Sequence, residues 1–301
     1  MSDQHESVAE VLLVAKELGV DGISPVILGD AGNLIVHLAP HPIVARVAKL
    51  VAGDDAYARW EILDREVRVA QHFARRGAPV VLPAAGAYAG PHRVGGTWMT
   101  WWQFLPKVSQ PPLDPGHAFD LVDSLAAAMA HFPEPLPVLG VWRTAAEAAG
   151  KLRVRATPDV RIADLLMAFE RVDERMRMLD CSSLLPAHGD AHLRNLLPGP
   201  EGWRWIDFED VSLMPRFWDL ASFIGNSALL DGLRHPLVRY VLNHPMVESD
   251  RSAFPDALTA RAVMSTTTNL ALALDGHGDL DFAMRQLDCM GDFLALVKRT
   301  L

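Results

Sequence analysis

A short stretch near residue 190 constrains the fold of this chain more than any other feature. It reads HGDAHLRN over residues 188–195, and WIDFE follows over residues 205–209. Apolar residues surround a Pro/Gly cluster between the two, and this pattern predicts a β-hairpin with its turn near residue 201. Asn195 and Asp207 would then face each other at the open end of the hairpin, with Asp190 just before it.

These three polar side chains suit one kind of chemistry. An amide oxygen from Asn195 and a carboxylate from Asp207 are ligands that Mg²⁺ accepts together with phosphate oxygens. Asp190 adds a carboxylate that can orient a hydroxyl group or take its proton. Phosphoryl transfer needs this combination, because its catalysis is mostly positioning and neutralisation of charge. We therefore predict Asp190 as the catalytic residue, and Asn195 and Asp207 as metal ligands.

The same motifs resemble those of the aminoglycoside phosphotransferase and choline-kinase-like branch of the protein-kinase superfold. Protein kinases carry HRDxxxxN and DFG, whereas this branch reads HGDxxxxN followed by IDFE or IDWE. A further match is PRFWDLA over residues 215–221, which is similar to the PxxWDLA of the family. The resemblance covers most of the chain and is strongest in its C-terminal half. It implies an enzyme that uses ATP and Mg²⁺ to phosphorylate a hydroxyl of a small molecule.

The resemblance also implies roles for the residues around the catalytic loop. His188 would hold the loop by hydrogen bonds, and Gly189 stands where protein kinases have an arginine that grips a phosphorylated activation loop. Asp219 resembles the family aspartate that accepts N–H groups of the loop, although a plain helix cap explains an aspartate there equally well. Glu209 and Asp210 lie close to the motif but receive no assigned role.

The N-terminal third predicts a helix over residues 7–18 and then a hairpin. Its strands are expected at 26–28 and 34–38, with a glycine-bearing turn at 29–33. A turn of this kind is weak evidence for a ligand by itself. In the family a glycine followed by an asparagine often occupies this turn, so Gly32 and Asn33 are candidate contacts for nucleotide phosphates.

Residues 42–49 predict a third strand that offers two cations to a nucleotide. Arg46 and Lys49 would point to opposite faces of this strand, so only one of them can reach the phosphates. VARV over residues 44–47 resembles the VLRV of the family and favours Arg46, whose guanidinium can fork onto phosphate or carboxylate oxygens. Glu66, on a helix predicted over 60–76, is the expected partner of Arg46. A solvated helix charge is the alternative for Glu66.

Two further strands, at 79–83 and 97–102, lead to the position of an interlobe hinge. Main-chain groups of Gln103, Phe104 and Leu105 would bind adenine there, as the resemblance implies. Trp101 and Trp102 either line the adenine slot or belong to the core.

The rest of the chain predicts mainly helices. They are expected at 118–132, 144–153, 160–179, 219–230, 236–242, 258–274 and 282–301. The overall expectation is an α+β, protein-kinase-like fold of two lobes. A small β-rich nucleotide-binding lobe covers residues 1–102, a hinge covers 103–106, and a larger, mainly helical lobe at 107–301 carries the catalytic loop and the acceptor site.

Composition narrows the class of partner. The net charge of −9 argues against nucleic acid and would suit a cationic, aminoglycoside-like acceptor, although solubility alone accounts for such a charge. Acidic residues that could bind an amine, or be solvated loop charges, are Glu248, Asp250, Asp275, Asp279 and Asp281. No apolar run is long enough for a membrane span, the polar start is unlike a signal peptide, and two cysteines make no disulfide framework. We therefore expect a cytoplasmic enzyme that acts on a small hydroxyl compound without a membrane partner.

Two other interpretations stay open at this point. A nucleotide-binding pseudokinase would keep the fold without catalysis. A metal-dependent hydrolase would use His188, Asp190 and His192, since imidazoles favour Zn²⁺ or Fe, but this leaves Asn195 and Asp207 without a purpose. Family members phosphorylate aminoglycosides, choline and other small alcohols, and no motif in the C-terminal helices separates these acceptors.

Overall fold

The computed structural model describes residues 2–30, 32–49, 55–155, 159–250 and 252–300. Ala31 in the predicted turn and Leu301 at the end of the last predicted helix lie outside the described residues. The chain divides into two compact units, Met1–Pro111 with Arg194–Glu209, and Pro112–Leu193 with Asp210–Leu301. Residues 194–209 follow the catalytic loop in the chain, yet they belong to the first unit because they pair and form hydrogen bonds with its residues.

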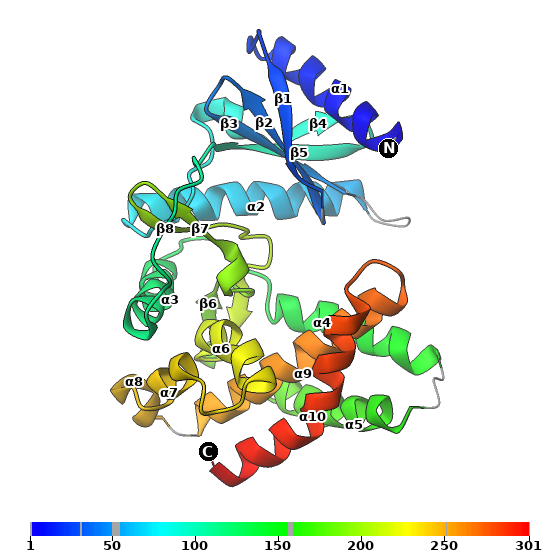
Figure 1. Ribbon diagram of the computed structural model, residues 1–301, viewed down its shortest axis with the longest axis vertical. Helices are drawn as coiled ribbons and strands as arrows, with labels where there is room; N and C mark the ends of the chain where they lie inside the picture. Colours follow the sequence, from blue (N-terminus) through cyan, green and yellow to red (C-terminus); the bar gives the residue numbers. More distant parts are fainter. Residues whose placement is uncertain (1, 31, 50–54, 156–158, 251, 301) are drawn as a thin grey trace. The chain divides into compact units, whose positions relative to one another are not determined.

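The first unit is built on an antiparallel sheet of five strands in the order β1-β2-β3-β5-β4 (Figure 1). Burial alternates along β2, which is the pattern of a strand with two differently packed faces. The strands are β1 (Ser24–Gly29), β2 (Asn33–Ala39), β3 (Ile43–Ala48), β4 (His92–Val94) and β5 (Thr97–Gln103). The short edge strand β4 is an addition to the strands predicted from the sequence.

Two helices cover opposite faces of this sheet (Figure 1). Val11 and Ala15 of α1 (Ser2–Glu17) join one core cluster with alternate residues of β2, β3 and β5, among them Trp101. α2 (Ala56–Arg75) lies on the other face and begins at Asp55, whose carboxylate accepts the N–H of Tyr57 at 2.8 Å. The face toward α2 therefore carries the polar side chains of the strands, Arg46 among them.

The first unit also contains the hairpin predicted around residue 201. β7 (Leu196–Gly199) and β8 (Gly202–Trp205) pair with Leu196 opposite Trp205. The strand predicted at 79–83 is wrong: only isolated bridges form there, Val80 with Trp205 and Pro83 with Trp102. Pro79 and Pro83 lack the N–H groups that a continuous ladder requires.

The second unit is mainly helical, and each helix predicted from the sequence is present, most of them with shifted ends. Its helices are α3 (Pro115–Met129), α4 (Gly140–Val154), α5 (Val160–Arg177), α6 (Trp218–Leu230), α7 (Pro236–Leu242), α8 (Pro245–Glu248), α9 (Ala253–Leu274) and α10 (Leu280–Thr300). The two short strands of this unit, β6 (Leu185–Ala187) and β9 (Ser212–Met214), pair antiparallel. In the two units together, 3₁₀ turns occupy Gly86–Ala89, Cys181–Ser183 and Leu193–Asn195.

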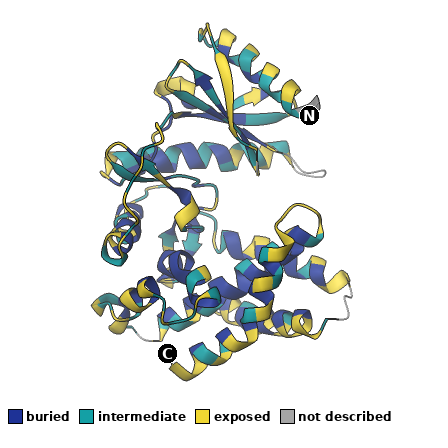
Figure 2. Ribbon diagram, in the orientation of Figure 1, coloured by how far each residue is buried: buried dark blue, intermediate teal, exposed yellow. Residues whose placement is uncertain are grey.

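Helix α9 forms the centre of the second unit. It packs against α4, α5, α6 and α10, and Figure 2 shows it largely buried. Residues on α9 are therefore held on several sides, which fixes the place of any polar side chain that it carries inward. Across the described ranges, no helix has both the length and the apolar character that crossing a membrane would require.

Candidate active site

A cavity of about 640 Å³ in the first unit collects most of the residues that the sequence singled out. Every predicted nucleotide contact except Gly32 lines it, and so does the predicted metal ligand Asp207. These lining residues are Asn33, Arg46, Glu66, Gln103, Phe104, Leu105 and Asp207. Its volume lies within the usual range for small-molecule sites, and its wall combines strands β2, β3 and β5 with the hairpin that follows the catalytic loop.

Arg46 is the centre of an ion-pair network at this cavity. Its Nη1 lies 2.6 Å from Glu66 Oε2, and its Nη2 lies 2.7 Å from both Asp207 Oδ1 and Glu209 Oε1. Burial works to lower the pKa of Arg46, but the carboxylates of Glu66, Glu209 and Asp207 outweigh it and raise that pKa above its usual value. Lys49 instead pairs with Asp30 at 2.7 Å, so Arg46 is the cation of β3 that lines the cavity.

Glu66 is a buried partner of Arg46 rather than a solvated helix charge. Only 1% of its side chain is exposed, and its Oε1 accepts the N–H of Phe208 at 3.2 Å. Burial raises the pKa of Glu66, and the charge of Arg46 opposes this rise. Through these contacts Glu66 ties helix α2 to strand β3 and to the segment that carries Asp207.

Glu209 is a site residue to which the sequence assigned no role. Its Oε1 accepts from Asn33 Nδ2 at 3.3 Å, and its Oε2 accepts from Arg59 Nη1 at 3.2 Å. Its main-chain oxygen accepts from Arg65 Nη2 at 3.2 Å. Glu209 thus connects the start of β2, helix α2 and Arg46. The available signal was its place as the last letter of IDFE, but the three partners become neighbours only in the folded chain.

The predicted hinge residues differ in whether their main-chain N–H groups are available to a ligand. Gln103 N–H donates to Leu82 O and Phe104 N–H donates to Pro42 O, both at 2.9 Å. The N–H of Leu105 has no protein acceptor among the described residues, so it is the hinge donor that stays available to a ligand. Trp102 lines the cavity, whereas Trp101 is fully buried in the core on the other face of the sheet.

The two predicted metal ligands lie at the open end of the hairpin, but the register places Asn195 opposite Ile206 and not opposite Asp207 as predicted. Ile206 N–H donates to Asn195 O at 3.0 Å, which continues the ladder beyond Leu196 and Trp205. Asp207 has a φ of 69°, a conformation that costs a non-glycine residue roughly 1–3 kcal/mol and that clusters at functional sites. The donors, an amide and a carboxylate, fit a hard cation such as Mg²⁺.

In the second unit, Asp219 fixes the predicted catalytic loop, residues 188–193. Its carboxylate accepts the N–H of His188 at 2.8 Å and of Gly189 at 3.0 Å, while Trp218 Nε1 donates to Gly189 O at 2.8 Å. The N-cap of α6 is Phe217, so Asp219 is not a plain helix cap. Burial raises the pKa of Asp219, against the charge of His188 and the two N–H groups.

Asp190 is held by two cationic or potentially cationic side chains. Arg261 Nη2 donates to its Oδ1, and His192 Nε2 lies 3.2 Å from its Oδ2. Burial favours a higher pKa, but the hydrogen bond from His192 and the charge of Arg261 outweigh it and hold the pKa of Asp190 well below its usual range. His188 is fully buried, and its Nδ1 accepts the N–H of Asp190 at 3.4 Å.

These contacts weigh against the hydrolase interpretation. His188 Nδ1 accepts a main-chain N–H of its own loop, and the carboxylate of Asp190 is engaged by Arg261 and His192. Within the ranges that the structure describes, no group of three or more His, Cys, Asp and Glu side chains is arranged to hold a metal ion.

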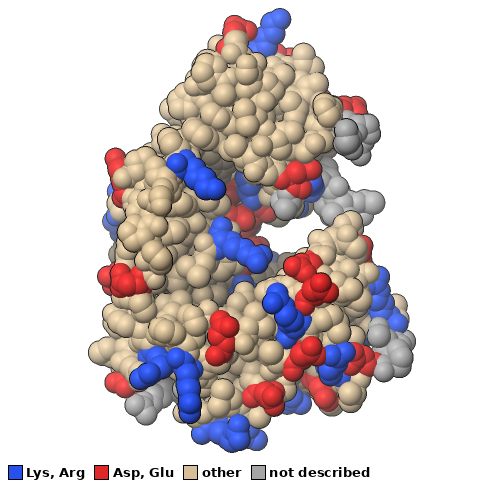
Figure 3. Space-filling view, viewed as in Figure 1, with Lys and Arg blue, Asp and Glu red and all other residues tan. Residues whose placement is uncertain are grey.

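The acidic residues considered for an amine acceptor mostly have structural partners. Asp250 pairs with Arg216 at 2.9 Å, Asp275 pairs with Arg155 at 2.9 Å, and Asp279 accepts the N–H of Phe282 at 2.9 Å. Glu248 and Asp281 lie on α8 and in the first turn of α10. Figure 3 shows acidic and basic side chains interspersed over the visible face of the second unit, not gathered into an acidic patch.

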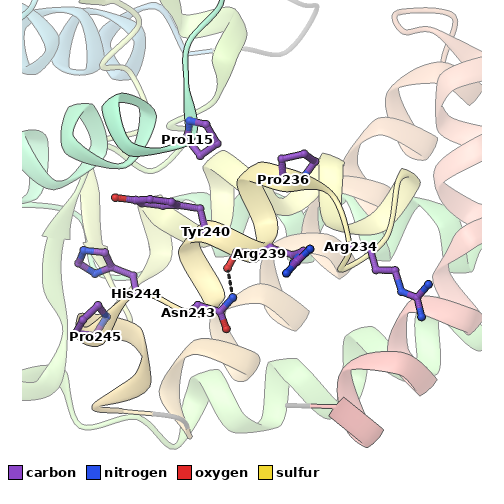
Figure 4. A pocket seen from close by; sticks show the side chains of 8 residues that line it. All are labelled: Pro115, Arg234, Pro236, Arg239, Tyr240, Asn243, His244 and Pro245. Carbon is purple, nitrogen blue, oxygen red and sulfur yellow. Dashed lines mark hydrogen bonds between the residues drawn. The ribbon is translucent and has the colours of Figure 1, made fainter.

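A separate hollow of about 600 Å³ in the second unit contains none of the predicted site residues. Its lining comes mainly from α7 and the residues on either side of it, and is shown in Figure 4. Arg234 and Arg239 lie apart in this view, and Asn243 Nδ2 turns back to the main-chain oxygen of Arg239 at 2.8 Å. Its polar groups do not converge, and we assign it no role.

Comparison with known proteins shows the family of this chain. Residues 47–247 match the phosphotransferase enzyme family. A search of curated proteins finds no match. Among solved structures, amicoumacin kinase hAmiN in complex with AMP-PNP, Ca²⁺ and Ami is similar at 13% identity and a TM-score of 0.67, covering 96% of this chain and 93% of that one.

Two further solved structures show the same fold. Choline kinase LicA from Streptococcus pneumoniae has 13% identity and a TM-score of 0.67, with 96% of this chain and 99% of that one covered. Spectinomycin phosphotransferase APH(9)-Ia in complex with ADP and spectinomycin has 12% identity and a TM-score of 0.61, with 95% and 97% covered.

Fold and family match together define a phosphotransferase with a kinase-like α+β architecture, and the predicted fold class is confirmed. The chain belongs to the phosphotransferase enzyme family, as the resemblance of its motifs predicted.

Proposed function

We propose that this protein is an ATP-dependent kinase that transfers the γ-phosphoryl group to a hydroxyl of a small acceptor. The observation that carries the proposal is the contact of one buried cation, Arg46, with both Glu66 and Asp207 at the wall of a nucleotide-sized cavity. A cation held between a helix carboxylate and a metal-binding carboxylate is the arrangement that kinases use for the α/β-phosphates.

The first unit would bind the nucleotide. Leu105 N–H would meet the adenine base, Arg46 would share its donors with phosphate oxygens, and Asn33, held by Glu209, would lie near the phosphates. Asn195 and Asp207 would hold Mg²⁺, which when bound neutralises charge on the β- and γ-phosphates. AMP-PNP and ADP in two of the similar structures support a nucleotide as the ligand.

Asp190 of the second unit would orient the acceptor. The hydroxyl oxygen forms a bond to the γ-phosphorus, while the bond from that phosphorus to the β,γ-bridging oxygen breaks and ADP leaves with the electron pair. Because its pKa lies below the usual range, Asp190 is a weak base. It therefore fixes the direction of the hydroxyl and receives the proton only as the new bond forms, after which the proton passes to solvent.

The test is ADP release with a panel of small hydroxyl compounds, compared between the wild type and Asp190→Asn. We expect Mg²⁺-dependent release that an acceptor stimulates and that falls by a factor on the order of 10² to 10⁴ in the variant. Nucleotide binding should be unchanged, because Asp190 belongs to the second unit and the Arg46 network belongs to the first. Binding of Mg²⁺-ATP without turnover of any acceptor would instead identify a pseudokinase.

A further inference from the structure

An arginine on the central helix of the second unit has no place in the family motifs. Arg261 lies on α9, beyond the residues that match the family. Only 9% of its side chain is exposed, which is unusual for an arginine without a functional or structural anion. A cation at this depth needs partners that satisfy both its charge and its donors.

Two contacts fix the guanidinium plane of Arg261. Its Nη2 donates to Asp190 Oδ1, and its Nε donates to Ser222 Oγ at 2.8 Å. Ser222 lies on α6, close to Asp219, which holds the loop that carries Asp190. Helices α6 and α9 thus fix the position of the Arg261 side chain, and Arg261 fixes the position of the predicted catalytic carboxylate of Asp190.

The guanidinium keeps donors that these contacts do not use. An arginine has five N–H donors, and within the part of the chain that the structure describes, Arg261 donates side-chain hydrogen bonds only to Asp190 and Ser222. Planar guanidinium groups bind carboxylate and phosphate oxygens through paired donors. The free donors of Arg261 therefore offer a binding point for an anionic group close to the carboxylate that orients the hydroxyl.

The surroundings of Asp190 are correspondingly poor for a cation. Arg261 forms an ion pair with Asp190, and the carboxylate of Asp219 accepts two N–H groups of the loop. Asp250 and Asp275, two of the acids considered for an amine, are already paired with arginines. An ammonium group beside the reacting hydroxyl would meet the guanidinium of Arg261 without a spare acid of this set to offset it.

We propose that Arg261 is a positioning residue for Asp190 and selects an acceptor with an anionic group near its hydroxyl, such as a hydroxycarboxylic acid. This deepens the proposed function and rests on Asp190 being the acceptor-orienting residue. The acceptor carboxylate would take the unused donors of Arg261, while Asp190 holds the hydroxyl.

Calorimetric titration tests the selection without requiring turnover. The probes are hydroxy acids of two to six carbons and amino alcohols of the same chain lengths, added to the free protein and to protein saturated with Mg²⁺ and AMP-PNP. We expect at least one hydroxy acid to bind the wild type at least tenfold more tightly than the amino alcohol of its length. Arg261→Gln should remove that preference.

Three further variants separate selection from folding. Arg261→Lys keeps the charge and should retain part of the hydroxy acid binding, and Asp190→Asn should strengthen it because the guanidinium is released. Arg175→Gln is the matched control: it removes an ion pair with Asp256 on the surface of the same helix α9 and should leave binding unchanged. Far-UV circular dichroism and thermal unfolding establish that each variant is folded.

Several results would overturn the proposal. They are tighter binding of the amino alcohols, binding of neither probe class, or unchanged hydroxy acid binding in folded Arg261→Gln. For a hydroxy acid that turns over, Arg261→Lys should raise the acceptor KM and lower kcat while the KM for ATP stays constant, a division that a purely structural role would not give. Failure of Mg²⁺-AMP-PNP to bind would count against the proposed kinase function and leaves the probe comparison on the free protein to decide the role of Arg261.

Discussion

Asp190 shows how neighbouring side chains determine what a single carboxylate can do. Its contacts with Arg261 and His192 favour the ionised form, so its pKa in the folded protein lies below the unfolded value of about 3.9. An acid whose pKa is lower in the folded state than in the unfolded state stabilises the fold fully at a pH above its unfolded-state pKa. This stabilisation is lost as the pH falls through its folded-state pKa.

The lowered pKa of Asp190 predicts how the stability of the protein depends on pH. The free energy of unfolding of the wild type, minus that of Asp190→Asn, should be constant from about pH 8 to about pH 5 and should shrink below about pH 4. Urea unfolding across that range measures the difference. A difference that declines already between pH 7 and pH 5 would show that Asp190 titrates near neutrality and is a stronger base than its contacts imply.

Single residues also show what the sequence could predict. The pairing of Arg46 with Glu66 followed from a resemblance in short motifs, and the two side chains are in contact. Arg261 was missed because its partner Asp190 lies 71 residues away in the chain and their contact depends on how α6 and α9 pack. Glu209 was noticed but had no role, since its partners Asn33 and Arg59 come from distant elements.

At the scale of elements, the catalytic loop depends on a glycine. Gly189 has a φ of +90°, and a Cβ at this position would lie 2.2 Å from Asp210 O. Both the backbone conformation and the lack of space therefore exclude a side chain. An arginine, which protein kinases have at this place, does not fit the loop in this conformation.

Gly189→Ala should therefore destabilise the protein by about 3 kcal/mol or more, because backbone strain adds to overpacking. Gly150→Ala is the control: Gly150 lies inside α4 with nothing within 4 Å of an added Cβ, and alanine there should stabilise by about 0.5–1 kcal/mol. Urea unfolding of both variants measures these changes. Equal stability of the two would contradict the loop conformation described for Gly189.

Elements with a strong local pattern were predictable, and those defined by distant partners were not. Helix α7 was predicted with its observed ends, since Pro236 starts it and apolar residues follow at helical spacing. Residues 79–83 looked like a strand because of their apolar run, but their partners Trp205 and Trp102 accept only isolated bridges. The edge strand β4 is only three residues long and carries too little pattern to be recognised.

At the scale of the whole molecule, the chain divides its chemistry between two units. The first holds the cavity together with Asn195 and Asp207, the proposed metal ligands, and the second holds Asp190 and Arg261. The boundary falls between residues 193 and 194, inside the motif itself. No sequence pattern marks this boundary, because it is set by the pairing of β8 with residues 79–81 and by the ion pairs of Arg46.

We predict that the first unit binds a metal-nucleotide complex through Asp207. Calorimetric titration of ATP, with and without Mg²⁺, into the wild type, Asp207→Ala and Asp250→Ala tests this prediction. Asp250→Ala is the control, because among the described residues the partners of Asp250 lie in the second unit. We predict Mg²⁺-dependent binding to the wild type and Asp250→Ala that weakens at least tenfold in Asp207→Ala. No binding to the wild type, or equal binding in folded Asp207→Ala, would contradict the account.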